Sequence, residues 1–364
     1  MPFERGTFAV TMFTLPENLP ENYLDLFNNR KAGGLDAVKD EAQIGWVGGR
    51  HLLENEIDES TAVCGGMVYL NLRKVERKIP ATLLKAVCKR DEFAYMHENQ
   101  VARVPSNTRK EIKEKAVEAY LHQTPPSLTG IPMVIDPTSK VLYLGTVSTA
   151  QIDLFIENFV KTTGIEPLQI NPESFLEKDF QVAPDELPNV MFSEQGDGEV
   201  TTGRDFLTWL WYFSEQEGGG VLKVEPYGEF AFYIQGPLTF AAASETRGAA
   251  ENTLKNGDPL RAAEAKTALT VGKKLKKAKF AIERGDELWT GNIDADLFNF
   301  SGFSIPDVEE LDFDSVFAER ITNLEIFRTV LTECFKLFVN TLLGGKWAEE
   351  ERKILEWVNN RETR

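Results

Sequence analysis

The chain has 364 residues, of which 42% are hydrophobic and 27% are charged, and its formal net charge is −17. This length predicts two domains or one elongated, multi-lobed chain rather than a single ordinary core, and the apolar content excludes general disorder. Three widely spaced cysteines, Cys64, Cys88 and Cys334, exclude a disulfide framework and a zinc site and favour a reducing compartment.

The start of the chain and its most apolar stretch predict neither export nor membrane insertion. Glu4 and Arg5 interrupt the N-terminus, and no apolar segment of signal-peptide length follows. Residues 330–343 contain Glu333 and Lys336 and are too short to span a bilayer. We therefore expect a cytoplasmic protein without a membrane partner.

The first half of the chain contains one unit with a particularly clear pattern. Residues 131–135 and 141–147 flank a five-residue polar turn and predict a hairpin. Ser148 and Gln151 have capping-box spacing at the start of an amphipathic helix, which Gly164 ends before a strand at 167–170. A further amphipathic helix is predicted at 109–122. This mixture predicts an α+β domain over residues 1–171.

The second half contains a similar mixture of elements. Residues 172–203, rich in Pro, Gly, Asp and Glu, predict a linker or long loop. Strands at 221–235, a hairpin at 279–293 and a long amphipathic helix at 315–343 then predict a C-terminal α+β domain over 204–345, with a charged helical tail at 346–364. The expected fold class is α+β, with antiparallel sheets packed by helices.

Charge is unevenly distributed in the second half. Residues 261–284 contain eight basic and two acidic residues, whereas residues 286–325 contain eleven acidic residues and one basic residue. Adjacent blocks of opposite sign predict one face for a polyanion and another turned away from it.

The densest basic run is the main candidate for phosphate binding. Lysines bind phosphates as point charges without reading base sequence. The alternative, equally favoured by the composition, is that these lysines are solvated at a strand edge and keep that edge from aggregating. A second basic cluster ends the apolar segment 62–73, where a solvated strand end is the favoured interpretation. The candidate DNA-binding residues are Lys273, Lys274, Lys276, Lys277 and Lys279, with Arg73, Lys74 and Arg77.

Enzymatic motifs are not recognisable. Residues 218–220 are a glycine run without the Lys-Ser or Lys-Thr of a phosphate loop, and His51, His97 and His122 have no metal-binding spacing. Asp294 and Asp296 would share a face of a strand and could hold Mg²⁺ in a nuclease, although a solvated strand end is the plainer interpretation. We predict no catalytic residue, metal or cofactor.

Several segments of the chain are informative through their joint order and spacing. They are Ile44-Gly45-Trp46-Val47, Arg73-Lys74-Val75-Glu76-Arg77-Lys78-Ile79-Pro80, the helix at 109–121, Met133-Val134-Ile135-Asp136, Pro167-Leu168, Leu207-Thr208-Trp209 and Leu342-Leu343-Gly344-Gly345. In these segments the chain resembles the RdgC family of recombination-associated proteins. The resemblance covers the first half well and the second half loosely.

The resemblance implies a homodimer closed into a ring around double-stranded DNA, which it would bind without sequence preference at the nucleoid. It also implies restraint of RecA-dependent recombination, with RecA met indirectly through DNA, and a part in replication-fork repair. Residues 236–268 look inserted relative to the family, and Thr124-Pro125-Pro126 replaces an aromatic near a subunit contact. The alternatives are a Mg²⁺-dependent nuclease and an acidic protein-interaction scaffold without a DNA role.

Overall fold

The computed structural model describes residues 3–35, 38, 41–194, 200–216, 219–242, 250–308 and 312–363. It comprises two compact units. Unit 1 contains residues 1–19, 64–67 and 134–364, and unit 2 contains residues 20–63 and 68–133. The sequence placed a boundary at 172–203, but the compact units divide elsewhere. Strand β1 (Phe8–Thr14) pairs with both β6 (Val141–Leu144) and β13 (Asn299–Ser304), which ties both halves of the chain into unit 1.

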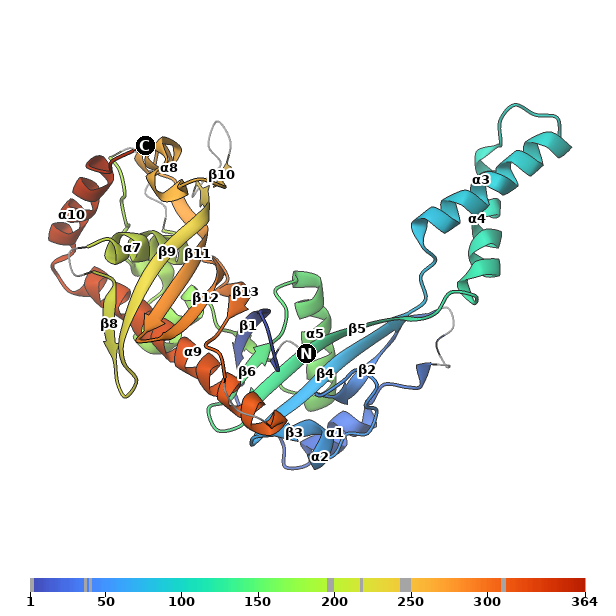
Figure 1. Ribbon diagram of the computed structural model, residues 1–364, viewed down its shortest axis with the longest axis horizontal. Coiled ribbons are helices and arrows are strands. Elements are labelled where there is room, and N and C mark those ends of the chain that lie inside the picture. The colour runs from blue at the N-terminus through green and yellow to red at the C-terminus, as the bar shows by residue number, and fades with distance from the viewer. Residues whose placement is uncertain are drawn as a thin grey trace. The chain divides into compact units, whose positions relative to one another are not determined.

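Unit 1 is built on an antiparallel sheet whose strand order is β10-β9-β11-β12-β13-β1-β6, followed by the end of β5 (Figure 1). Short strands β7 (Leu168–Gln169) and β8 (Val221–Val224) pair with β1 and β9. The remaining strands are β9 (Gly228–Ala241), β10 (Glu251–Leu254), β11 (Lys274–Arg284), β12 (Glu287–Asp294) and β5 (Ser127–Asp136). The hairpins predicted at 131–147 and 279–293 are confirmed.

One face of the β9–β13 region is apolar and is covered by helices. Phe280, Phe300 and Phe303 pack around Phe327 of the long helix α9 (Phe313–Leu343). Helix α7 (Thr202–Ser214) contacts β9 and β11 beside it. Burying each such aromatic side chain contributes about 1.5–3 kcal/mol, so this face anchors the unit. The other helical segments of unit 1 are α5 (Thr149–Thr163), α6 (Pro172–Phe175), the π-helical turn η2 (Leu176–Phe180), η3 (Pro184–Glu186), η4 (Pro259–Arg261), α8 (Ala263–Thr270) and α10 (Trp347–Asn359).

For helix α5, the predicted C-terminal end is confirmed and the predicted N-terminal capping box is not. It ends at Gly164, whose φ of 77° is in the left-handed region that glycine favours. The predicted capping box is wrong, because the Ser148 side chain makes no cap hydrogen bond. Thr146 Oγ1 donates instead to Gln151 Oε1 and accepts from the Ser148 N–H at 3.1 Å.

Unit 2 combines a small sheet with a pair of helices. Strand β2 (Gln43–Gly48) pairs with β4 (Met67–Glu76), and the strand order is β5-β4-β2. Helices α3 (Ala81–Glu98) and α4 (Ser106–Leu121), here called the helix pair, follow β4 and precede β5 (Figure 1). Shorter elements are α1 (Tyr23–Asn29), α2 (Glu59–Ala62) and β3 (Val63–Cys64).

The predicted α+β class with antiparallel sheets packed by helices is therefore confirmed. Cys64 and Cys334 are buried and Cys88 is half-buried, and none of the three forms a disulfide. Within the described residues, no helix combines the length and the apolarity needed to cross a bilayer.

Candidate nucleic-acid interface

The β9–β13 region presents a polar surface opposite its helix-covered face. Inward residues such as Trp289 and Ile293 alternate with outward residues such as Thr290 and Asn292, which is the pattern of a sheet with one solvated face. We call this surface the open sheet face. It consists of Tyr233, Gln235, Thr239, Lys277, Lys279, Thr290, Asn292, Asp294 and Ser301.

The predicted lysine run lies on β11 and just before it, but the structure does not leave it as one free cationic patch. Lys274 is buried, and its Nζ lies 2.5 Å from Oδ1 of Asp205 on α7. Burial raises the pKa of Asp205, although the ammonium of Lys274 opposes that shift. Lys273 lies outside the strand and donates to Asn252. These two lysines therefore have partners within the fold.

The next lysines face the acidic block directly. Lys277 is opposite Asp294 in the β11–β12 register, and their charged groups are 2.8 Å apart. This hydrogen bond raises the pKa of Lys277. Lys276 pairs with Glu251 of β10 at 2.5 Å and lies 4.0 Å from Asp296. The expectation that the two charge blocks turn away from each other is thus wrong, because antiparallel pairing of β11 with β12 brings them side by side.

Lys279 differs from its neighbours in the run. It is half-buried on the open sheet face, opposite Gln235 on one side and Asn292 on the other. It makes no ion pair with any residue in the described ranges. Of the five lysines, Lys277 and Lys279 are the ones whose position on this face suits contact with a ligand.

The second predicted cluster stabilises unit 2 from within. Arg73 is 1% exposed and donates from Nη1 to Leu52 O at 2.9 Å and to Asn55 Oδ1 at 3.0 Å. Its burial lowers its pKa. Arg77 donates from Nε to Val38 O at 2.9 Å, and Lys74 pairs with Glu76 at 2.8 Å. This cluster thus belongs to unit 2, whereas the lysine run belongs to unit 1, and Arg73 and Arg77 make structural hydrogen bonds within their unit.

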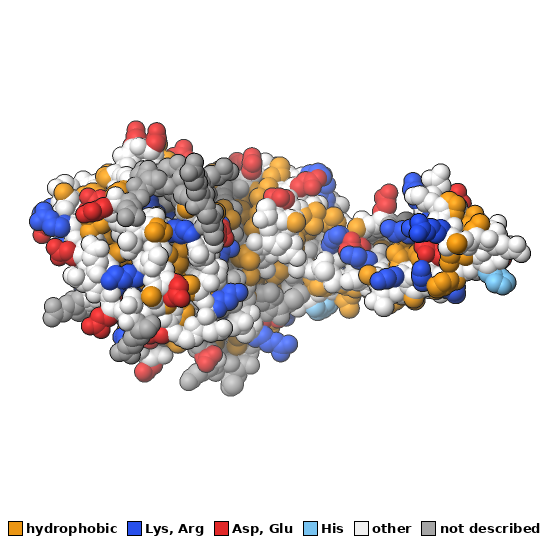
Figure 2. All heavy atoms as spheres, turned by 90° about the horizontal axis from the view of Figure 1, so that it is seen from above, with side chains coloured by type: hydrophobic (Ala, Val, Ile, Leu, Met, Phe, Trp, Pro, Cys, Tyr) orange, Lys and Arg blue, Asp and Glu red, His pale blue; other side chains and the backbone are white. Residues whose placement is uncertain are grey.

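The helix pair carries exposed cations that the sequence patterns do not single out. Residues 81–121, from the start of α3 to the end of α4, contain eight Lys or Arg and six Asp or Glu. Unit 2 as a whole is neutral, so the charge of −17 resides in unit 1. Figure 2 shows Lys and Arg side chains interspersed with exposed apolar ones on the helix pair. Because basic residues outnumber acidic ones only slightly, a residue count gives little signal for this surface.

Some cations of the helix pair have acidic partners and others do not. Arg109 reaches across from α4 to Glu92 of α3 at 3.2 Å, and Arg90 pairs with Asp91 at 2.7 Å. Four further cations are exposed, and none of them forms an ion pair with a described residue. These four are Lys85 on α3, Arg103 in the loop between the two helices, and Lys113 and Lys115 on α4.

The proposed magnesium pair is not a recognisable metal site. Asp296 receives two hydrogen bonds of 2.8 Å from Nε and Nη2 of Arg204, and Asp294 is held by Lys277. Arg204 thereby has a raised pKa, mainly through its hydrogen bonds to Asp296. Among the described residues, no group of three or more His, Cys, Asp or Glu side chains is placed to hold a metal ion.

Comparison with known proteins supports the family resemblance. The chain is an α+β protein with exposed cations on both units. Residues 23–178, less than half of the chain, match the family model described as "RdgC: Putative exonuclease, RdgC", which confirms the resemblance to the RdgC family found in the sequence. The match supports a recombination-associated, DNA-binding role. The matched segment contains the whole helix pair, whereas the open sheet face lies beyond it. No curated protein shows significant similarity to the chain.

Proposed function

We propose that the chain binds double-stranded DNA without reading its base sequence, in a role that modulates RecA-dependent recombination and replication-fork repair. The observation that carries this proposal is the coincidence of two features on one segment. The family match at 23–178 contains the helix pair, and Lys85, Arg103, Lys113 and Lys115 are exposed there without a carboxylate partner in the part of the chain that the structure describes. Unpaired lysines and arginines on a surface bind phosphates irrespective of base sequence.

The open sheet face supports the proposal as a second contact surface. Hydroxyl and amide groups of Ser, Thr, Asn, Gln and Tyr contact DNA phosphates alongside lysines. Lys279 lies there between Gln235 and Asn292, and the face's own carboxylate, Asp294, is held by Lys277. These side chains can contact the DNA backbone, although the net negative charge of unit 1 as a whole repels DNA.

The family resemblance adds two more specific proposals. The chain binds DNA as a ring-like homodimer, and it affects RecA only through DNA. Such a homodimer would place basic surfaces of two copies toward one duplex in the nucleoid. Sedimentation equilibrium tests the assembly, for which we expect a dimer. A strictly monomeric chain at concentrations where DNA is bound would contradict the ring.

A salt titration tests the DNA proposal itself. Two duplexes of unrelated sequence should shift in a gel at low salt with equal affinity, and log affinity should fall linearly with log salt by about 0.9 per phosphate contact. A clear preference for one sequence would contradict non-specific binding. Absence of any shift at low salt would remove the DNA role and leave the acidic scaffold.

We propose that the role is not enzymatic, because Arg204 and Lys277 already engage the carboxylates that the nuclease alternative needs. Labelled duplex incubated with the protein and Mg²⁺ should stay intact, and shortening of the label with time would overturn this part.

A further inference from the structure

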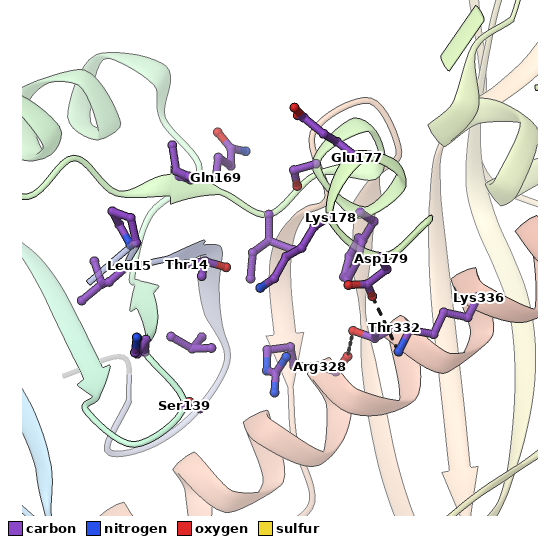
Figure 3. Close-up of a pocket in the computed structure, with 17 residues that line it drawn as sticks. Thr14, Leu15, Ser139, Gln169, Glu177, Lys178, Asp179, Arg328, Thr332 and Lys336 are labelled. Atoms are coloured by element: carbon purple, nitrogen blue, oxygen red, sulfur yellow. Dashed lines mark hydrogen bonds and ion pairs between the residues drawn. The ribbon is translucent and has the colours of Figure 1, made fainter. Parts of the chain in front are cut away.

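Unit 1 contains a cavity of about 720 Å³ that the DNA proposal does not use. It lies between the residues that follow β1, the β5–β6 turn, β7, the η2 turn and helix α9 (Figure 3). Cavities of about 300–1,000 Å³ bind small organic ligands. The space is therefore large enough for a ligand of nucleotide size.

Cationic side chains line part of the cavity. Lys140, Lys178, Arg328 and Lys336 line it, with Glu177 and Asp179 as the lining carboxylates. Figure 3 shows Lys178 extending into the cavity toward Arg328, whereas Glu177 projects away from it. Asp179 lies 3.6 Å from Lys336, and Lys178 forms no ion pair with any described residue. Lys178 and Arg328 thus face the same space, and Glu325, the carboxylate that pairs with Arg328, does not line it.

Arg328 is held in place by a hydrogen-bonded chain. Its Nε donates to Glu325 at 2.9 Å, and Tyr143 donates to the same carboxylate at 2.5 Å. Burial, followed by the charge of Glu325, raises the pKa of Tyr143, so the phenol keeps its proton and remains a donor. Such fixed guanidinium groups suit recognition of phosphate, because little rotamer freedom is lost when the ligand binds.

Apolar side chains also line the cavity. Leu15, Val141, Leu168 and Ile170 line it, and Leu168 is 56% exposed although it lies beside a cavity. An exposed leucine next to fixed cations matches a ligand with a flat apolar part and an anionic end. The base and the phosphate of a nucleotide have these two properties.

The backbone around the cavity is unusual in two places. The η2 turn, which carries Glu177, Lys178 and Asp179, is π-helical, and Gln181 after it has a φ of 55°. Lys140, on the rim, has a φ of 57°. Single π-helical turns are rare and often occur at functional sites, and non-glycine residues seldom adopt the left-handed conformation.

We propose that this cavity binds a nucleoside phosphate, with the phosphate at Lys178 and Arg328 and the base against Leu15 and Leu168. This site is separate from the DNA surfaces proposed above. The ligand can be a free nucleotide or the terminal nucleotide of a 5′-phosphorylated DNA strand, since both present the same phosphomonoester chemistry.

Calorimetric titration of the full chain with dAMP tests the proposal. We expect saturable binding that weakens about tenfold or more in Lys178→Gln, and that persists in Lys353→Gln, which removes an exposed lysine on α10. Leu168→Ala should weaken dAMP binding while leaving weak binding of inorganic phosphate unchanged. Thermal melting checks that each variant is folded.

Two further titrations separate the sources of the ligand. Tighter binding of a short 5′-phosphorylated strand than of dAMP, lost when the strand lacks its phosphate, assigns the site to DNA ends. Binding of dAMP alone assigns it to free nucleotides. Absence of saturable dAMP binding at millimolar concentration, or equal affinity in Lys178→Gln, would overturn the site, whatever the salt titration of duplex DNA shows.

Discussion

The lysine run of β11 and the helix pair of unit 2 are both rich in cations, but the fold treats them differently. Around β11, Lys274, Lys276 and Lys277 each meet a carboxylate from another element. On the helix pair, Lys85, Arg103, Lys113 and Lys115 remain exposed and unpaired among the described residues. The lysine run of β11 is the denser of the two in sequence, yet carboxylates neutralise more of its charges in the folded structure.

The largest effect expected from this comparison concerns the buried pair of Lys274 and Asp205. Lys274→Met should lower the free energy of unfolding by about 3–5 kcal/mol, because it leaves a buried carboxylate unpaired. Urea denaturation measures the loss. In Lys274→Met/Asp205→Leu the loss should be much smaller, since the orphaned charge is also removed. An undiminished loss in the double variant would point to packing rather than to charge.

The pH dependence of that variant follows from the same pair. Burial already raises the pKa of Asp205, and loss of Lys274 removes the main opposing influence. The folded state of Lys274→Met should therefore bind a proton more readily than the unfolded chain. Its deficit in unfolding free energy should shrink as the pH falls through the acid range and be largest near neutrality.

A smaller effect is expected from removal of the unpaired cations of the helix pair. Replacing Lys85, Arg103, Lys113 and Lys115 by Gln should weaken binding to all duplexes alike and flatten the salt slope by about 4 if each contacts a phosphate. A matched control with the same charge change replaces Lys161, Lys223, Arg261 and Lys353 of unit 1, which are exposed and ion-paired.

The control decides between local contact and total charge. If both quadruple variants lose the same affinity, net charge rather than the helix pair governs binding. If neither loses affinity, the contact surface lies elsewhere, and Lys277→Gln/Lys279→Gln on the open sheet face becomes the next variant to titrate.

The smallest effect should come from releasing one neutralised lysine. Asp294→Asn frees Lys277, which is about half exposed. We expect slightly tighter DNA binding, a salt slope steeper by about 1, and a stability change within about 1 kcal/mol. The nuclease alternative predicts no gain in binding and, in wild type, a Mg²⁺-dependent cleavage that this substitution abolishes.

The comparison also shows how far the sequence could lead. Local patterns predicted the hairpins at 131–147 and 279–293, helix α5 and helix α9, because period and turn chemistry are encoded in neighbouring residues. The partners of charged residues are not encoded in this way. Asp205 meets Lys274 and Arg204 meets Asp296 through pairings of distant segments, and Arg73 is surrounded by carbonyls of loops that no period predicts.

The cavity proposed to bind a nucleoside phosphate could not be predicted from the sequence either. Its lining comes from five separate stretches between Thr14 and Lys336, none of which contains a recognisable phosphate-binding motif. The four cations of the helix pair and its loop, in contrast, can each be read from the sequence, although the absence of an ion-pair partner among the described residues cannot.

The division of the chain into units has a consequence for dissection of the molecule. Because the backbone enters unit 2 twice, at residues 20 and 68, and returns twice to unit 1, neither unit is a contiguous fragment. Shortening the polypeptide from either end removes strands of unit 1 before it isolates unit 2. Limited proteolysis at a single loop should accordingly yield nicked chains that stay associated, rather than two separable fragments.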